Sequence, residues 1–325
     1  MKLLVTGGSG FIGSNFIKIC LNSSKKNSII NLDSMFVGSN PKNLQNIHSK
    51  NYKFIKGNIC DSHLIKKLID KVDCVVNFAA ESHVDRSIDD STAFLKSNVL
   101  GVHTILEEIR KNKRVKLLQI STDEVFGDKL KGSFSENDPL SPSNPYAATK
   151  AAAEMLVKSY ARTYDLDVTI TRCVNNYGPN QFPEKLIPKV ILYALNDLPI
   201  PIHGDGKAIR QWIHVSDHCR AILKILQKNP PHSVYNIPGN YESTNIKLVK
   251  SILKIMKKSD KLIKFVPDRL GQDKRYALKS NFVSNDIGFK PKINFDSGLS
   301  STILWYMNNK NWWKNYFSKN KIHNF

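Results

Sequence analysis

The first half of the chain alternates short apolar runs of strand length with longer stretches of helical periodicity. The apolar runs cover residues 2–6, 28–32, 52–55, 74–78, 116–120 and 167–172. Helical patterns begin near Phe11, Ser62, Ser91 and Pro145. Strands that alternate with helices form a parallel sheet with helices on both faces. The pattern therefore predicts an α/β fold with a doubly wound parallel sheet.

From about Asn175 onward the strict alternation breaks down, and Pro and Gly become frequent. We expect a smaller C-terminal α/β region there, which would cover the carboxyl edge of the sheet and bind substrate. The predicted division is a nucleotide-binding domain with the catalytic residues over residues 1–174 and a substrate-binding region over 175–314. A basic, frayed tail is expected over residues 315–325.

The composition is that of an ordinary globular protein, with 325 residues, 41% hydrophobic and 23% charged. No apolar stretch reaches the roughly 18 residues that a membrane helix needs. The N-terminus runs directly into the first predicted strand, so we expect no signal peptide, no membrane partner and a cytoplasmic location. The five cysteines are far apart, which predicts reduced thiols and neither a metal site nor a disulfide framework.

The chain is strongly basic, with 48 Lys and Arg against 28 Asp and Glu and a formal net charge of +20. Such a charge raises nucleic-acid binding as an alternative function. The lysines are spread along the whole chain, however, which favours a general compositional bias and no nucleic-acid partner. A non-catalytic NAD sensor or nucleic-acid-binding protein on the same fold remains an alternative, and a steep salt dependence of DNA binding would support it.

A glycine-rich turn follows the first strand and opens a helix, which is typical of a Rossmann-type dinucleotide site. Gly7, Gly10 and Gly13 allow a tight turn, close approach of a pyrophosphate and close packing of helix on strand. Asp33 ends the second strand, 20 residues after Gly13. A carboxylate there accepts hydrogen bonds from a ribose 2′-hydroxyl and repels a 2′-phosphate. The sequence therefore predicts NAD as the cofactor, in preference to NADP.

The candidate chemical centre combines a strand end with the start of a helix. Thr122, Asp123 and Glu124 follow the strand 116–120, and Tyr146 and Lys150 share one helix face at positions i and i+4. An ammonium group near the phenol would lower the pKa of Tyr146, which could then take a hydroxyl proton as hydride leaves the same carbon. Water elimination needs two more groups, one to take a carbon-bound proton and one to protonate the leaving hydroxyl. Two carboxyls in different environments can divide these roles.

Further motifs resemble the dTDP-glucose 4,6-dehydratase family of the extended short-chain dehydrogenase/reductase superfamily. They lie at residues 78–87 (FAAESHVDRS), 122–124 (TDE), 175–179 (NNYGP) and 182–188 (FPEKLIP), and the similarity extends over nearly the whole chain. Sister families such as UDP-galactose 4-epimerases share the glycines and the Tyr–Lys pair but generally lack the Asp–Glu pair. The resemblance implies conversion of dTDP-glucose to dTDP-4-keto-6-deoxyglucose, by transient C4 oxidation, water elimination across C5–C6 and hydride return to C6.

The same resemblance implies a role for each residue of the chemical centre. Tyr146 would be the base for the sugar 4-hydroxyl, Lys150 would tune it and bind the nicotinamide ribose, and Thr122 would hydrogen-bond the 4-oxygen. Glu124 would remove the C5 proton, and Asp123 would donate a proton to the departing 6-hydroxyl.

The resemblance also implies two sets of binding residues. Besides Tyr146 and Lys150, the NAD contacts would be Gly7, Gly10, Phe11, Ile12, Gly13, Asp33, Asn58, Ile59, Ala80, Ser97 and Asn176. The contacts to the sugar nucleotide would be Ser82, Thr122, Asn175, Lys185, Leu186, Pro201, Ile202, His203, Arg210, Asn245, Arg269 and Gln272.

Three positions depart from the family pattern. Asn58 stands where Asp is usual, and its carbonyl oxygen can still accept a hydrogen bond from the adenine amino group. His203 stands where Tyr is common, and the Arg269–Gln272 segment differs from the usual Arg-Pro-Gly-His. Whether the substrate nucleotide carries thymine or uracil therefore stays open. His83 is expected to pack in the sugar loop, without a catalytic role.

The remaining expectations concern assembly and alternatives. The resemblance implies a homodimer, with the helices near residues 91–111 and 145–164 as candidates, and a step in deoxysugar biosynthesis such as that of rhamnose. The alternative functions are a UDP-glucose or UDP-N-acetylglucosamine 4,6-dehydratase, which could also epimerise, and a nucleotide-sugar 4-epimerase. An epimerase has no use for Asp123 and Glu124 as acid and base.

Overall fold

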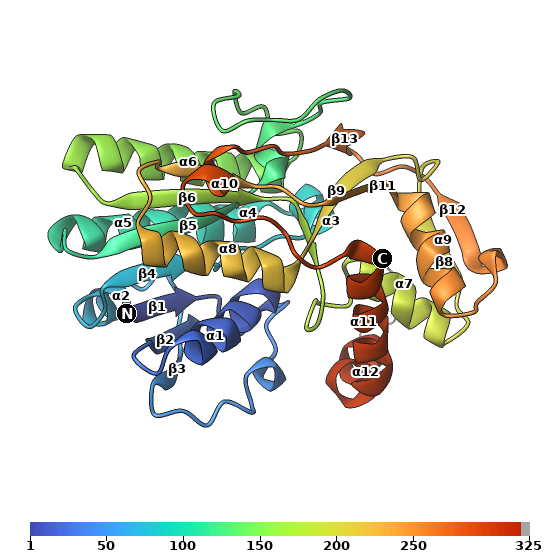
Figure 1. Ribbon diagram of the computed structural model, residues 1–325, viewed down its shortest axis with the longest axis horizontal. Helices are drawn as coiled ribbons and strands as arrows, with labels where there is room; N and C mark the ends of the chain where they lie inside the picture. The colour runs from blue at the N-terminus through green and yellow to red at the C-terminus, as the bar shows by residue number, and fades with distance from the viewer. Residues whose placement is uncertain (320–325) are drawn as a thin grey trace.

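The structure, a computed structural model, describes residues 1–319 and is organised around a large parallel sheet (Figure 1). Its strands are β1 (Lys2–Thr6), β2 (Ser28–Asp33), β3 (Tyr52–Lys56), β4 (Cys74–Asn77), β5 (Lys116–Thr122), β6 (Val168–Cys173) and β10 (Val234–Ile237). They lie in the order β10-β6-β5-β4-β1-β2-β3. The direction of progression reverses between β1 and β4, and such a reversal leaves a ligand-binding crevice at the carboxyl ends of the strands.

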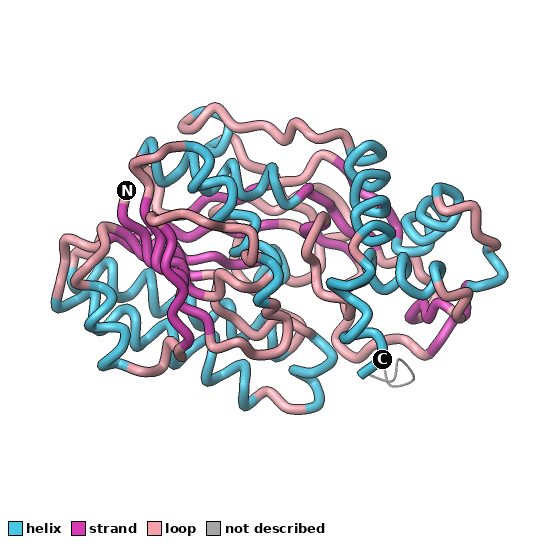
Figure 2. Tube along the Cα trace, turned by 90° about the horizontal axis from the view of Figure 1, so that it is seen from below, coloured by secondary structure: helices cyan, strands magenta, loops and turns pink. Residues whose placement is uncertain are grey.

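Helices cover both faces of this sheet, which confirms the doubly wound fold. One face carries α1 (Phe11–Ser23) and α8 (Val215–Lys228), and the other carries α2 (Ser62–Ile69), α5 (Gly101–Lys111) and α6 (Pro145–Tyr164). Successive side chains of a strand point to opposite faces. Accordingly, Leu3 and Val5 belong to one core and Leu4 to the other. Figure 2 shows the strands as one layer between two layers of helices.

The seventh strand comes from beyond the predicted boundary at residue 174. β10 pairs in parallel with β6, with Val234 opposite Ile170, and α8 packs against α1. The large sheet thus takes one strand and one covering helix from the part of the chain assigned to substrate binding. β10 has only four residues, so its apolar pattern alone does not distinguish it from a strand of the second region.

The second region has its own sheets and core. β7 (Asn175–Tyr177), β9 (Ile209–His214), β11 (Tyr241–Thr244) and β13 (Arg275–Tyr276) form one sheet, and β8 (Ile200–His203) pairs with β12 (Ile263–Val266). Around them pack α7 (Leu186–Leu195), α9 (Asn245–Ile255), α11 (Phe295–Asn308) and α12 (Lys310–Lys319). The short turns are η1 (Pro41–Asn43), α3 (Val84–Asp89), η3 (Asp123–Phe126), η4 (Asp260–Leu262) and α10 (Phe282–Asn285).

The helix expected near Ser91 is broken into α4 (Thr92–Phe94), a π-helical turn η2 (Leu95–Leu100) and α5. Such π turns are frequent at functional sites. Asn98, buried in this turn, accepts a hydrogen bond from the Glu81 amide and donates to the Glu81 carbonyl and to Thr149 Oγ1. The irregular turn therefore ties the loop after β4 to helix α6.

The C-terminal tail expected to be frayed from Asn315 is helical as far as Lys319. Burial of Trp312 and Trp313, at 7% and 4% exposure, anchors this helix on the second core. Residues 320–325 lie outside the described part of the chain. Within residues 1–319, no helix has both the length and the apolar character needed to span a membrane.

Candidate active site

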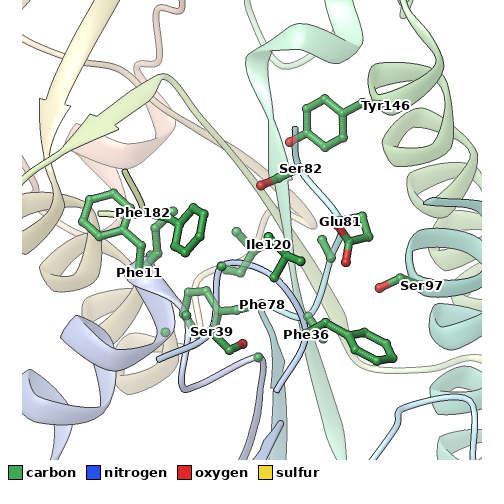
Figure 3. Close-up of a pocket in the computed structure, with 18 of the residues that line it drawn as sticks. Phe11, Phe36, Ser39, Phe78, Glu81, Ser82, Ser97, Ile120, Tyr146 and Phe182 are labelled. Atoms are coloured by element: carbon green, nitrogen blue, oxygen red, sulfur yellow. The ribbon is translucent and has the colours of Figure 1, made fainter. Parts of the chain in front are cut away.

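A cavity of about 630 Å³ lies at the carboxyl ends of the large sheet (Figure 3). Dinucleotides and other ligands of comparable size occupy pockets of about 300–1,000 Å³. Every residue predicted to contact NAD lines it: Gly7, Gly10, Phe11, Ile12, Gly13, Asp33, Asn58, Ile59, Ala80, Ser97, Tyr146, Lys150 and Asn176. The structure therefore brings this predicted set together around one cavity, which we call the first cavity.

The glycine turn has no room for side chains. Gly7 has a φ of +66°, and a Cβ there would stand 2.6 Å from the backbone nitrogen of Ala79. A Cβ on Gly13 would stand 2.6 Å from the Gly7 carbonyl oxygen. Helix α1 begins directly after this turn, at Phe11. The first amides of α1 therefore face a space that a phosphate can approach closely.

Asp33 organises the loop at the rim of the first cavity. It is 4% exposed, and its carboxylate accepts hydrogen bonds from the Ser9 amide at 2.9 Å, the Met35 amide at 2.8 Å and Ser39 Oγ at 2.8 Å. Asn58 Oδ1 accepts from the Cys60 amide at 2.9 Å. An amide oxygen has two lone pairs. Asn58 therefore keeps acceptor capacity for a second donor, such as an adenine amino group.

The five predicted catalytic residues line the same cavity. Thr122 ends β5, Asp123 and Glu124 begin η3, and Tyr146 and Lys150 lie in the first turns of α6. Pro145 is the first residue of α6, and the Asn144 side chain caps the helix by accepting from the Ala147 amide at 2.9 Å. Figure 3 shows the phenol of Tyr146 directed into the cavity near Ser82.

The two carboxyl groups of η3 lie in different environments. Asp123 is 2% exposed and Glu124 is only partly buried. Burial, with Glu124 close by, raises the pKa of Asp123 well above its usual range. Thr122 Oγ1 donates to Asp123 Oδ1 at 3.1 Å, while Oδ2 has no hydrogen-bond partner among the described residues. A carboxyl held protonated at neutral pH suits a proton donor.

The predicted lowering of the pKa of Tyr146 by Lys150 is wrong for this structure. Burial, with a further contribution from Glu124, raises the pKa of the phenol well above its usual value. The Lys150 ammonium donates to the Ile120 carbonyl at 2.7 Å, and burial lowers the pKa of Lys150 to about 8. The sequence shows that the two side chains share a helix face, but not that both become buried.

A second cavity of about 180 Å³ adjoins the first. It is lined by the predicted substrate residues Ser82, Asn175, Lys185, Leu186, Pro201, Ile202, His203, Arg210, Asn245, Arg269 and Gln272. Thr122, the remaining one, lines the first cavity. Glu124, Ser82 and Lys185 line both cavities. The two cavities therefore meet at the residue predicted to remove the C5 proton.

The cations of the second cavity are held by protein groups. Arg210 donates to the carbonyls of Ile209 and Asp273, each at 2.8 Å, and lies over the Tyr276 ring with 4.4 Å to the centroid. Lys185 Nζ donates to the Ser82 carbonyl at 2.7 Å. These contacts fix where the two positive charges lie.

Arg269 joins the two halves of the molecule. Its Nε and Nη2 meet the two carboxylate oxygens of Asp85 at 2.5 and 2.9 Å. Arg269 follows β12 and Asp85 lies on α3, so this two-pronged ion pair crosses from the second region to the large sheet. The sequence predicts Arg269 as a nucleotide contact, and the structure adds Asp85 as its protein partner.

Several lining residues were not predicted as site residues: Glu81, Arg86, Glu184, Trp212, Asp273 and Tyr276. Arg86 pairs with Glu184 at 3.2 Å across 98 residues of sequence. Asp273 is 3% exposed, and burial raises its pKa to about 6. Glu184 stands in the FPEKLIP motif and Asp273 just before Arg275–Tyr276, so the two motifs point to these positions. Their partners, Arg86 and Arg210, lie far away in sequence, and no local pattern predicts the contacts.

His83 lines the second cavity without the environment of a proton-transfer group. It is buried, with Nε2 at 3.8 Å from Asp85 and 4.0 Å from Glu184. Burial, with Lys185 and Arg86 nearby, lowers the pKa of His83 to about 2. A neutral imidazole at this position fits the predicted packing role.

Comparison with known proteins agrees with this geometry. A profile of the GDP-mannose 4,6 dehydratase family matches residues 4–302. The dTDP-glucose 4,6-dehydratase of Streptomyces niveus is 41% identical over 319 residues, which cover 97% of this chain and 95% of that protein. The chain belongs to the dTDP-glucose 4,6-dehydratase family.

Solved structures of the family have the same fold over nearly the whole chain. The dTDP-glucose 4,6-dehydratase of Bacillus anthracis, in complex with NAD, has 43% identity and a TM-score of 0.91, with 97% of this chain and 99% of that chain covered. The enzyme of Streptomyces venezuelae, also with NAD bound, has 40% identity and a TM-score of 0.94 over 97% and 99%. The Rossmann-type fold predicted from the sequence is confirmed.

Proposed function

We propose that the chain is an NAD-dependent dehydratase that converts dTDP-glucose to dTDP-4-keto-6-deoxyglucose. One observation carries this proposal. A buried Asp123 with a raised pKa lines the first cavity beside Glu124, which lines both cavities. An acid and a base side by side at this junction serve water elimination, whereas epimerisation at C4 requires neither.

The oxidation at C4 uses the threonine and the phenol. Thr122 donates a hydrogen bond to the 4-oxygen, and Tyr146 takes the proton of the 4-hydroxyl. Bound NAD supplies the hydride acceptor, whose positive charge also favours the phenolate of Tyr146. Lys150 is held by the Ile120 carbonyl beneath the cavity and contributes a second positive charge below its pKa of about 8.

The elimination uses the two carboxyl groups. Once C4 is a ketone, the C5 proton becomes acidic, and Glu124 removes it. Asp123 gives its proton to the 6-hydroxyl, which leaves as water. After reduction at C6, Glu124 returns its proton to C5, and the proton held by Tyr146 replaces the one that Asp123 lost. The net change is the loss of one water molecule from the sugar.

The second cavity supplies the diphosphate contacts. Arg210 presents a planar guanidinium, which pairs with phosphate oxygens in two-pronged fashion. Lys185 lies at the junction of the cavities, between the sugar and the diphosphate. We expect the nucleoside base beside Pro201, Ile202 and His203, where the family pattern is least well matched.

The test offers the purified protein dTDP-glucose, UDP-glucose and UDP-N-acetylglucosamine in parallel. The 4-keto-6-deoxy product is detected by its absorbance in alkali. Turnover of dTDP-glucose with the highest kcat/KM supports the proposal. Turnover of UDP-sugars alone would still support a 4,6-dehydration reaction but would contradict thymidine as the nucleoside of the substrate. Release of a 4-epimer without the keto product would overturn the proposed function.

We further propose that the protein is a cytoplasmic homodimer that serves deoxysugar biosynthesis, such as that of rhamnose. The helices α5 and α6 pack side by side, and apolar side chains remain exposed on or beside them: Leu95 at 53%, Leu100 at 50% and Met155 at 47%. Pairing of this surface with its copy would bury these groups. Sedimentation of wild type and Met155→Glu tests it, since the variant should shift toward monomer.

A further inference from the structure

The C-terminal helix α12 is bonded to the loop after β2, 269 residues earlier in the sequence. Trp312 Nε1 donates to Asn43 Oδ1 at 2.7 Å, and Lys42 Nζ donates to the Asn311 carbonyl at 2.7 Å. Trp312 and Asn43 are 7% and 2% exposed. In Figure 1, α12 lies at the lower edge of the molecule, in the vicinity of the blue loop after β2. The contact is therefore a buried hydrogen bond between the two ends of the chain.

Asn43 also hydrogen-bonds to the glycine turn. Its Nδ2 donates to the Ser9 carbonyl at 2.8 Å, and the Asn40 amide donates to the same carbonyl at 3.0 Å. The Ser9 amide in turn donates to Asp33 Oδ2 at 2.9 Å. An unbroken series of hydrogen bonds thus runs from Trp312 to the two elements that the sequence assigns to the pyrophosphate and the ribose.

Helices α11 and α12 together support a second wall of the first cavity. The hydroxyl of Tyr306, on α11, donates to the Gln181 carbonyl, and the ring of Tyr316, on α12, contacts Phe182 at 5.2 Å between centroids. Gln181 and Phe182 both line the first cavity. Figure 3 shows Phe182 beside Phe11, the first residue of α1.

We propose that α12 controls retention of the bound dinucleotide, with Trp312 and Asn43 as positioning residues. This inference rests on the proposed NAD binding. Neither residue lines the first cavity. They act through Ser9, whose carbonyl accepts from Asn43 Nδ2 while its amide donates to Asp33. Loss of the indole N–H leaves Asn43 Oδ1 buried without that donor, and such a deficit costs enough to loosen the turn.

The chain offers a matched control on the same helix. Trp313 is 4% exposed, and its Nε1 donates at 2.8 Å to the Tyr306 carbonyl, on α11. Trp312→Phe and Trp313→Phe each remove one buried indole N–H, but only the first interrupts the series that leads to Ser9. Thermal unfolding of both variants without nucleotide measures the stability loss that they share.

The experiment measures NAD dissociation from the full-length protein by displacement with excess unlabelled nucleotide. We expect Trp312→Phe to release NAD about three- to tenfold faster than wild type. A missing buried hydrogen-bond donor costs about 1 kcal/mol or more, which corresponds to a ratio of rates of this order if the loss falls on the bound state. Trp313→Phe leaves the series to Ser9 intact and should release NAD more slowly than Trp312→Phe. At saturating NAD, kcat of Trp312→Phe should stay within twofold of wild type, roughly the scatter expected of a distant substitution.

A double-mutant cycle sharpens the test. Asn43→Ala cuts the same series from the other side, so Trp312→Phe combined with Asn43→Ala should release NAD no faster than Asn43→Ala alone. Equal release rates for the two Trp variants, or additive effects in the double variant, would overturn the role of α12. A wild-type protein that binds no NAD would overturn both this inference and the proposed function. Asn43→Ala alone carries the test if Trp312→Phe fails to fold.

Discussion

The two cavities of the molecule are built in different ways. The first cavity lies where β1, β2, β4, β5 and β6 end and where α1 and α6 begin, so many of its lining residues stand within a few positions of a predictable strand or helix end. The second cavity is lined by loops and short strands from separate parts of the chain, between Ser82 and Tyr276. A site placed on regular elements is readable from local patterns, whereas a site made of loops depends on distant pairings.

The cavities also differ in their charges. The first contains the buried carboxyl of Asp123 and the phenol of Tyr146, both with pKa values raised by burial. The second contains Arg210, Arg269 and Lys185, each held by a protein carbonyl or carboxylate. This difference supports the proposed division, with proton transfer in the first cavity and the diphosphate of the sugar nucleotide in the second, and the following predictions test it.

The largest effect is expected at Glu124. Glu124→Gln should lower kcat by about 10²- to 10⁴-fold, because general base catalysis is lost. NAD binding should stay unchanged, and the absorbance of reduced cofactor should accumulate after sugar oxidation. Asp123→Asn should slow water loss more than hydride transfer. Stopped-flow absorbance separates these steps, and normal turnover by both variants would remove the assigned carboxylate roles.

Breaking the buried ion pair between Arg172 and Glu154, next to the first cavity, should lower the free energy of unfolding more than breaking an exposed pair. Arg172 Nη2 meets Glu154 Oε2 at 2.7 Å, with both side chains 1% exposed or less, and Glu154 follows Lys150 by one turn of α6. Glu154→Leu should destabilise the fold by about 3–5 kcal/mol, because a buried guanidinium loses its partner. Adding Arg172→Met should recover most of this loss in urea unfolding.

A partly exposed pair in the second region provides the contrast. Arg275 meets Glu242 at 2.8 Å, with side-chain exposures of 12% and 37%. Glu242→Gln should cost only about 0–1 kcal/mol, since solvent screens such pairs. Equal losses for Glu154→Leu and Glu242→Gln would show that the two regions do not differ in this respect.

Arg210 tests the second cavity for phosphate binding. Arg210→Lys keeps the positive charge but loses the two-pronged geometry, so KM for dTDP-glucose should rise about tenfold with kcat little changed. Arg275→Lys is the matched control, because Arg275 does not line either cavity. A fall in kcat with unchanged KM would place Arg210 in the chemistry of the first cavity.

The last prediction concerns the pH dependence of stability. Burial raises the pKa of Asp273 from 3.8 to about 6, so the native state holds this proton more tightly than the unfolded chain does. The resulting stabilisation is complete below pH 3.8 and is lost as the pH rises through 6. In Asp273→Asn, the free energy of unfolding should fall less steeply across this window, by about 1 kcal/mol per pH unit. Urea midpoints measure both slopes, and identical slopes would contradict the raised pKa.

The sequence by itself predicted six of the seven strands of the large sheet, the glycine turn with Asp33, and Thr122–Glu124, Tyr146 and Lys150 as the candidate chemical centre. Apolar runs and the Gly7–Gly13 turn are local features, and parallel strands bring their carboxyl ends to one edge whatever the loops do. Resemblance to a family added the substrate residues, and the structure gathers them around the second cavity. The fold prediction is confirmed because it depends on patterns within single strands, turns and helices.

The tertiary structure alone decided the properties that depend on burial and on distant partners. It added β10 to the large sheet, paired Arg269 with Asp85 and bonded Trp312 to Asn43. It also reversed the expected pKa shift of Tyr146, because burial of the phenol, with Glu124 nearby, raises its pKa. Solvent exclusion and long-range hydrogen bonds arise only when segments hundreds of residues apart pack together, and no local pattern encodes them.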